Sequence, residues 1–422
     1  MYERWVEAHP RDAEAAELLA RTLSWAGRLD EAERLYQVLA LGGSPAAERG
    51  LAQLAAWRGD LPQSERRWRA IVVKRPDDAE AWVGLAQVLR WTGRPREART
   101  ALKRALAADA SNGDAAEQLK WVEAAIGPTV DPSVAFLEDT DGNCVTTTAG
   151  TFALAAPWEG ELSLRLHNRA AAFGAGRASS LGGALAARRT AGRVALSASL
   201  GATRLGDESA ATAARYVPTA AGAVSLGLGR RAGLGAGLAR EPYDETTSLI
   251  RRGIVATTLG AVGSLGFGRH VDLAGEIEHA ALTGGTPNTR LGGSASLNWR
   301  ARHMLTLGAS VRGFGYAADP IEGYFAPRRY VLAEATTRLA VGRELGWSAT
   351  VDGGLGAQTV ATRFGGSETQ PASRGTFAFR YRPTPTLEFS ATAMRANAAA
   401  RSTATVKSYH TSGWSLRGRV SF

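Results

Sequence analysis

From residue 126 to the end of the chain, apolar and polar residues alternate with a period of two. In the segment 294–301, Ala295, Leu297 and Trp299 alternate with polar residues, and Phe377, Phe379 and Tyr381 do the same in 376–383. A period of two gives a β-strand one apolar and one polar face. About 16 such segments follow one another at intervals of roughly 18 residues, as in a meander of hairpins.

Two environments suit strands of this kind: a soluble sandwich with an apolar core, or a membrane barrel with lipid outside and water inside. The segments run to about 10–14 residues, which is long for soluble sheets and sufficient to cross a bilayer at a tilt. Arginine recurs in mid-strand on the polar face, where a wet lumen would solvate it. The chain also ends on an in-phase aromatic, Phe422, which resembles the signal read by the barrel assembly machinery of the outer membrane. We therefore expect a transmembrane β-barrel over 132–422.

The strand count has one ambiguous region, because residues 246–268 are hard to divide between strands. Sixteen strands are predicted, with 14 or 18 left open, since bacterial barrels have even numbers of strands. A barrel of 16 strands is wide enough for an aqueous channel. The tripeptide at 141–143, Asp-Gly-Asn, is expected to be a hairpin turn early in the barrel.

Residues 1–125 contain a helical repeat with a period of about 34 residues. Each unit carries a tryptophan and, two residues later, a glycine for the turn between two helices. The repeated pairs are Trp25 and Gly27, Trp57 and Gly59, and Trp91 and Gly93. This layout resembles the tetratricopeptide repeat, so the predicted fold class is α + β: a helical repeat array, a linker over 126–131 and an antiparallel barrel.

The three repeated tryptophans admit two interpretations. Their exposed faces could form a platform that stacks on sugar rings, or their side chains could pack between the two helices of each unit. Because they occupy one repeated position, we expect packing between the helices. The register of the repeats also places Tyr2 eight residues before Pro10, as Trp68 lies eight before Pro76. From this we expect that the array is truncated at its N-terminus and that a signal peptide and further repeats lie upstream.

The charge of the chain is concentrated in its second part. Residues 1–130 carry equal numbers of acidic and basic residues, so the formal excess of +10 belongs to the remainder. The basic residues there are mostly single arginines between apolar residues, whereas a nucleic-acid surface more often shows clusters. We therefore predict no nucleic-acid partner.

Residues for catalysis or for a cofactor are not found. The six histidines show no ligand spacing, the single Cys144 excludes thiolate zinc sites, and the acidic stretch at 139–143 lacks the glycine and glutamate of a calcium loop. Glycine pairs lie within alternating strands with no helix following to receive a phosphate. The predictions are therefore no catalytic residues, no metal, no cofactor and no enzymatic activity.

A specific resemblance adds to this interpretation. The segment Gly323-Tyr-Phe-Ala-Pro-Arg-Arg-Tyr330 and the following residues 345–358 are similar to part of the barrel of bacterial exopolysaccharide export proteins. This family includes the cellulose synthase operon protein C and poly-N-acetylglucosamine export porin types. Ala326 and Arg328 depart from the family's serine and glutamine. The order of repeats, linker and barrel also matches this family.

The resemblance implies a passive outer-membrane conduit for a polysaccharide chain, with periplasmic repeats that bind a synthase complex. Two alternatives stay open: a barrel-anchored scaffold with a plugged pore, and a small-solute porin. The excess positive charge of the barrel region leads us to expect a neutral or anionic polymer. The candidate pore-lining residues lie on the polar faces of their strands. They are Arg312, Arg338, Arg380, Arg382, Arg417, Arg419, Glu334 and Asp352. A purely structural network with Glu388 is the alternative role for these residues.

Overall fold

The computed structural model describes residues 9, 12–156, 158, 160–207, 214–229, 231–319, 324–398 and 409–422. The chain forms two compact units, 1–126 and 127–422, each described here by itself. Tyr2, Pro10 and Gly323, on which two sequence predictions depend, lie outside the described residues. Among those residues, no helix has the length and apolar character needed to cross a membrane.

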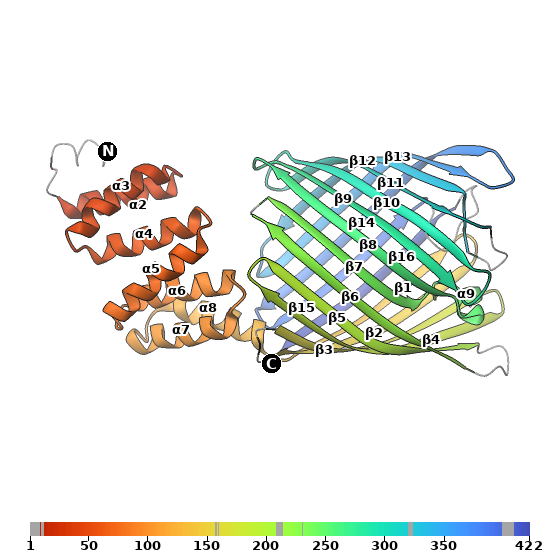
Figure 1. Ribbon diagram of the computed structural model, residues 1–422, viewed down its shortest axis with the longest axis horizontal. Helices are drawn as coiled ribbons and strands as arrows, with labels where there is room; N and C mark the ends of the chain where they lie inside the picture. The colour runs from red at the N-terminus through yellow and green to blue at the C-terminus, as the bar shows by residue number, and fades with distance from the viewer. Residues whose placement is uncertain are drawn as a thin grey trace. The chain divides into compact units, whose positions relative to one another are not determined.

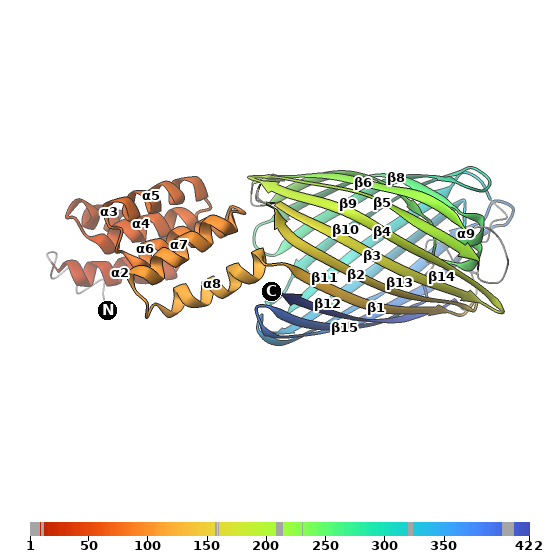
Figure 2. The same cartoon turned by 90° about the horizontal axis from the view of Figure 1, so that it is seen from below.

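The N-terminal unit consists of antiparallel helix pairs (Figures 1 and 2). The turn within each helix pair contains a glycine in the left-handed region, at φ 78° for Gly27, 84° for Gly59 and 76° for Gly93. Asp12, Ser44 and Asp78 cap the first helices of successive units by accepting a backbone hydrogen bond. The helices are α2 (Ala13–Trp25), α3 (Leu29–Leu41), α4 (Pro45–Trp57), α5 (Leu61–Lys74), α6 (Ala79–Trp91), α7 (Pro95–Ala108) and α8 (Gly113–Ile126).

Successive units pack through aromatic rings against glycines. A Cβ built on Gly50 would lie 2.5 Å from the Tyr36 ring, and one on Gly84 would lie 2.5 Å from the Trp68 ring. Tyr36 and Trp68 are accordingly buried. The absence of a side chain at these two glycines lets the second helix of one unit press against the first helix of the next.

The repeated tryptophans do not pack as predicted. Trp25 is 70% exposed, Trp57 37% and Trp91 49%, so the expectation that they fill the space between helices is wrong. Each is the last residue of its helix. The buried face of α2 carries Ala16, Ala20 and Leu23, and Trp25 lies two positions beyond it, about 200° around the helix. The sequence register identified the repeat but not the direction of the side chain.

The second unit is a closed antiparallel barrel of sixteen strands, which confirms the predicted strand number and fold class. Every strand pairs with its neighbours in sequence, and β1 pairs with β16. The strands are β1 (Thr129–Asp139), β2 (Asn143–Ala156), β3 (Gly160–Phe173), β4 (Gly176–Ala191), β5 (Val194–Asp207), β6 (Arg215–Leu228), β7 (Ala232–Pro242), β8 (Val255–Phe267), β9 (Val271–Thr283), β10 (Asn288–Arg300), β11 (Leu305–Tyr316), β12 (Arg329–Gly342), β13 (Gly346–Ala361), β14 (Ser367–Thr384), β15 (Leu387–Ala396) and β16 (Thr411–Ser421).

The ambiguous region 246–268 contains a short helix, α9 (Thr247–Arg252), followed by β8. Gly253, at φ 64°, ends the helix in the left-handed region. The linker is shorter than the predicted 126–131, because α8 extends to Ile126 and β1 begins at Thr129. The hairpin turn predicted at 141–143 joins β1 to β2 and is confirmed, with Gly142 at φ 91°.

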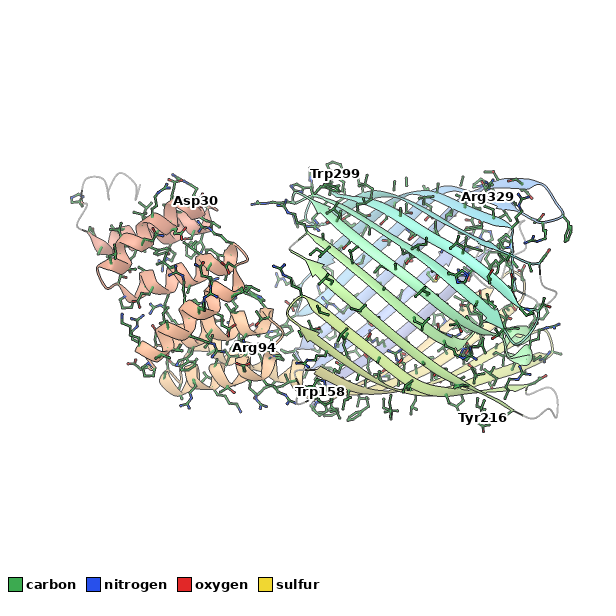
Figure 3. All side chains as sticks on the ribbon, viewed as in Figure 1. Asp30, Arg94, Trp158, Tyr216, Trp299 and Arg329 are labelled. Carbon is green, nitrogen blue, oxygen red and sulfur yellow. The ribbon has the colours of Figure 1, made fainter. Side chains whose placement is uncertain are left out.

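The outer face of the barrel carries an apolar belt. Cross-strand partners on this face include Leu297 with Leu273 and Trp347 with Tyr381, all of them exposed in the isolated chain. In Figure 3, Trp158 and Trp299 lie at the end of the barrel where β1 begins and β16 ends, and Tyr216 and Arg329 lie at the opposite end. We call these the terminus end and the loop end. An exposed apolar belt with interfacial aromatics is the surface that a bilayer covers.

Candidate functional site in the barrel lumen

Helix α9 lies inside the barrel at the loop end. Ile250 belongs to a buried apolar cluster with side chains of β2 to β6 and β8, and the adjacent Leu249 belongs to a second cluster with side chains of β9 and β11 to β14. A six-residue helix can join clusters on these separate walls of a closed barrel only from within. Leu249 and Ile250 are 0% and 2% exposed. The inner faces of these strands are therefore identified by the residues that cluster with α9.

Buried polar contacts hold this inward segment in place. Asp244, just before α9, accepts hydrogen bonds from Arg169 on β3 and Ser180 on β4. Arg251 forms an ion pair with Asp207 of β5 at 3.1 Å between Nε and Oδ2. The segment from 243 to 254 is thus anchored on β3, β4 and β5, two to four strands away from β7, where it begins.

A cluster of aromatic side chains meets α9 from the opposite wall. Phe314 and Tyr330 stack with ring centroids 4.8 Å apart, and Tyr324 lies edge-on to Tyr243 at 5.9 Å. Tyr324 Oη also accepts a hydrogen bond from Nδ2 of Asn288 at 2.9 Å. Tyr324 belongs to the segment singled out by its family resemblance, which precedes β12 as a loop. Together with α9, these rings narrow the lumen at the loop end.

One wall of the lumen carries an ordered row of charge pairs. Arg374 of β14 contacts Glu334 of β12 at 3.1 Å and Asp352 of β13 at 2.5 Å. Arg338 of β12 shares Asp352 at 2.9 Å. Farther along, Arg380 lies 3.8 Å from Glu388. The two groups of ion pairs together span β12 to β15.

The remaining predicted residues lie on the same inner face. Arg382 approaches Glu388 at 3.9 Å, and Arg417 of β16 pairs with Asp131 of β1. The Arg312 guanidinium lies over the Tyr330 ring, 5.9 Å from the ring centroid. Arg419 forms no ion pair within the described residues. The alternation therefore places all eight candidate side chains on the inner face. That they contribute to passage of a polymer through the lumen is a proposal.

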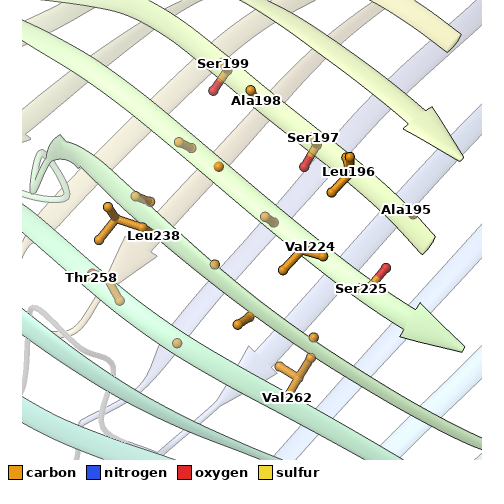
Figure 4. Close-up of a pocket in the computed structure, with 18 of the residues that line it drawn as sticks. Ala195, Leu196, Ser197, Ala198, Ser199, Val224, Ser225, Leu238, Thr258 and Val262 are labelled. Carbon is orange, nitrogen blue, oxygen red and sulfur yellow. The ribbon is translucent and has the colours of Figure 1, made fainter. Parts of the chain in front are cut away.

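The opposite wall is lined by small residues. A cavity of about 680 Å³ follows the inner face of β4 to β9, bordered by residues such as Ser197, Ser199 and Thr258 (Figure 4). An adjoining cavity of about 430 Å³ is bordered by Tyr243, Asp244 and Glu245 and shares Arg165 and five small residues with the first. The short side chains leave room along this wall, whereas the long charged side chains occupy space on the other.

Sequence reasoning missed several residues of this site. Arg374 follows the same polar face as Arg380 and Arg382, so extending that alternation toward the start of β14 would have found it. The inward course of 243–254 carries no such signal, because a six-residue helix between two strands has no periodic pattern to detect. Asp244 and Tyr243 were missed for the same reason. Among the described residues, no cluster of three or more potential metal ligands occurs.

The assembly residue predicted from sequence lies at the terminus end. Phe422 is 74% exposed, and its N–H donates to the carbonyl of Pro128 at 2.9 Å. The aromatic ring therefore remains available on the surface while the backbone closes the seam between β16 and β1.

The fold and lumen define an outer-membrane type β-barrel of sixteen strands preceded by tetratricopeptide repeats. Residues 69–120 match the tetratricopeptide-repeat family. A bacterial polysaccharide outer membrane secretin is similar in structure, with a TM-score of 0.55 at 10% sequence identity, covering 70% of this chain and 98% of that chain. A second similar structure is CdiB from Acinetobacter baumannii, with a TM-score of 0.46 at 12% identity, covering 69% and 60%. No curated protein sequence matches the chain.

Proposed function

We propose that this protein is an outer-membrane conduit for export of an exopolysaccharide. The observation that carries the proposal is the combination of repeats with a closed sixteen-stranded barrel that shares its fold with nearly the whole length of a polysaccharide secretin. The lumen offers hydrogen-bond donors and acceptors on one wall and space on the other. A hydroxyl-rich chain could exchange its hydration for weak contacts at many positions, which permits movement.

The partners follow from the two units. The polymer would pass through the barrel, and the repeats, placed in the periplasm, would bind proteins of an inner-membrane synthase complex. Such a conduit makes and breaks no bond, so it needs no catalytic group or cofactor. The excess of positive charge in the barrel unit favours a neutral or anionic polymer over a cationic one.

The inward helix α9 supports one feature of the scaffold alternative, a pore that is closed at rest. Planar bilayer recording of the full chain tests this directly. We expect low conductance for the native protein and a clear rise when residues 245–252 are replaced by a short Gly-Ser linker. High native conductance, unchanged by that replacement, would show that α9 does not obstruct the lumen.

Export itself is tested in the bacterium. Deleting the gene should abolish surface polysaccharide and leave polymer in the periplasm, and the complementing gene should restore it. A glycosyltransferase synthase gene next to this one is the expected neighbourhood. Normal surface polysaccharide in the deletion strain, together with altered uptake of small solutes, would favour the porin alternative and contradict export.

A further inference from the structure

The exposed tryptophans of the repeats form a second surface that the barrel lumen does not account for. We define the tryptophan row as Trp25, Trp57 and Trp91, the last residues of α2, α4 and α6. These are the first helices of successive units, and each contacts the next. All three side chains are exposed. The indoles therefore follow one another along one face of the array, one in each unit.

A groove of about 590 Å³ lies along α2 and α4 and includes two rings of this row, Trp25 and Trp57. The buried rings of Tyr36 and Trp68 also line the groove. Trp68 is 4% exposed, and its Nε1 has no hydrogen-bond partner among the described residues. An acceptor from water or from a ligand hydroxyl would satisfy this donor. The groove thus combines aromatic faces with an unused hydrogen-bond donor.

The indole is repeated in every unit, whereas its neighbours on the same helix face change. Residues four and eight positions before each tryptophan share its face of the helix. These residues are Arg21, Gln53 and Gln87, and Glu17, Arg49 and Val83. A peptide of mixed sequence presents a different side chain to each unit, but a polysaccharide presents the same ring. A repeated aromatic on stacked units therefore suits a ligand that is itself built from repeated units.

The chemistry of the groove matches the two kinds of surface on a sugar. The C–H groups on the face of a sugar ring stack on a flat aromatic ring, whose face carries partial negative charge. The hydroxyls at the edge of the sugar need polar partners, which Gln53 and Arg21 supply in the groove. The Arg21 guanidinium also lies over the Trp25 ring, 5.4 Å from the ring centroid, and this contact helps to fix the orientation of the indole.

The charges of the groove select a neutral ligand over an anionic one. Three carboxylates line it, Glu14, Glu17 and Glu80, against the two cations Arg21 and Arg49. Arg49 already forms an ion pair with Glu80 at 2.9 Å. An anionic polymer would therefore approach carboxylates that the groove's own arginines do not outnumber, and like charges brought together oppose binding.

We propose that the tryptophan row binds a neutral polysaccharide, with each indole stacked on a sugar ring, so that the repeats hold the polymer as well as protein partners. Several weak and equivalent contacts retain a long chain by avidity, while each contact can break without the others. The inference rests on the proposed export function and narrows its polymer to an uncharged one.

The test measures binding of soluble oligosaccharides to the full-length protein in detergent micelles by isothermal titration calorimetry. The probes are two neutral hexasaccharides, cellohexaose and hexa-N-acetylchitohexaose. The native protein should bind at least one of them. W25L/W57L should bind it about tenfold to a hundredfold more weakly, because leucine keeps an apolar surface but has no flat face for stacking. The matched control W25F/W57F keeps two aromatic faces and should retain most of the affinity. Hexagalacturonate, an anionic probe, should bind the native protein more weakly than the neutral sugar.

Far-UV circular dichroism verifies that both variants keep their helices, as expected for exposed positions. Equal affinities of the native protein and W25L/W57L would place the sugar site elsewhere, and would overturn the proposal without affecting export. Tighter binding of hexagalacturonate, or no binding of either neutral probe, would also overturn it. If W25L/W57L lowers surface polysaccharide in the bacterium although the native protein binds neither neutral sugar, the groove serves a protein partner instead. The gene-deletion test of export is independent of all these results.

Discussion

Replacing Arg374 with glutamine is expected to destabilise the barrel more than the same replacement at any of the luminal arginines predicted from the sequence. The Glu334 side chain is 5% exposed and the Asp352 side chain 17%, and both lie against this guanidinium. Breaking a buried ion pair costs about 3–5 kcal/mol, because the remaining charge stays desolvated. Because Arg374 is itself 32% exposed and Asp352 keeps its ion pair with Arg338 at 2.9 Å, the cost lies at the low end of this range. We expect the free energy of unfolding to fall by about 3 kcal/mol.

The matched control is Arg338→Gln. Its side chain is 63% exposed and it contributes a single contact to Asp352, so the expected loss is at most about 1 kcal/mol. Urea unfolding of both variants in detergent micelles, followed by tryptophan fluorescence, gives the free energies of unfolding. The double variant E334Q/R374Q should recover part of the stability, since it removes the stranded carboxylate as well. Equal losses for R374Q and R338Q would refute the reasoning that burial of Glu334 sets the cost.

Three more outcomes are expected. Deleting Phe422 should sharply lower the amount of heat-modifiable barrel in the outer membrane while leaving the helical repeats folded; normal levels would exclude it as an assembly signal. Replacing Arg380 and Arg382 with glutamine should shift the reversal potential across a salt gradient toward cations, provided that α9 is first replaced to open the pore, and an unchanged potential would reduce these arginines to a structural role. In the repeats, the hydrogen bond from Arg94 holds the pKa of Glu97 below its usual range. A depressed pKa adds stability above the unfolded value of about 4.3, and this is lost as the pH falls through the folded value. Helical circular dichroism should therefore decline below about pH 4, with a shallower decline in E97Q, and identical profiles would contradict this.

The barrel could be predicted because its pattern is local. Alternation along a strand is visible in a few residues, and meandering hairpins require no knowledge of distant pairing. The same parity indicated the inner face for residues such as Arg380 and Arg417. The ion-pair partners of luminal arginines could not be predicted in this way. Arg374 pairs with Glu334 across an intervening strand, and that pairing depends on the register of two successive hairpins.

The misjudged features have a different origin. Trp25 was assigned from its repeated position, although the i, i+3 and i+4 spacing of the buried residues in α2 excludes it from the packed face. The inward path of α9 depends on Asp244 finding Arg169 and Ser180, which are more than sixty residues away in the sequence. Such contacts are decided by tertiary structure, and a local pattern cannot contain them.

The seam between the first and last strands also constrains how the molecule is made. Fifteen of the strand pairings join consecutive segments and can form as hairpins with little loss of chain entropy. The remaining one joins Thr129 to Ser421 and must wait until β16 has been synthesised. Until then, both edge strands expose unpaired backbone groups that could pair with another chain. Closure is therefore expected to be the slow step of folding, and the interval before it is when the nascent chain most needs a chaperone.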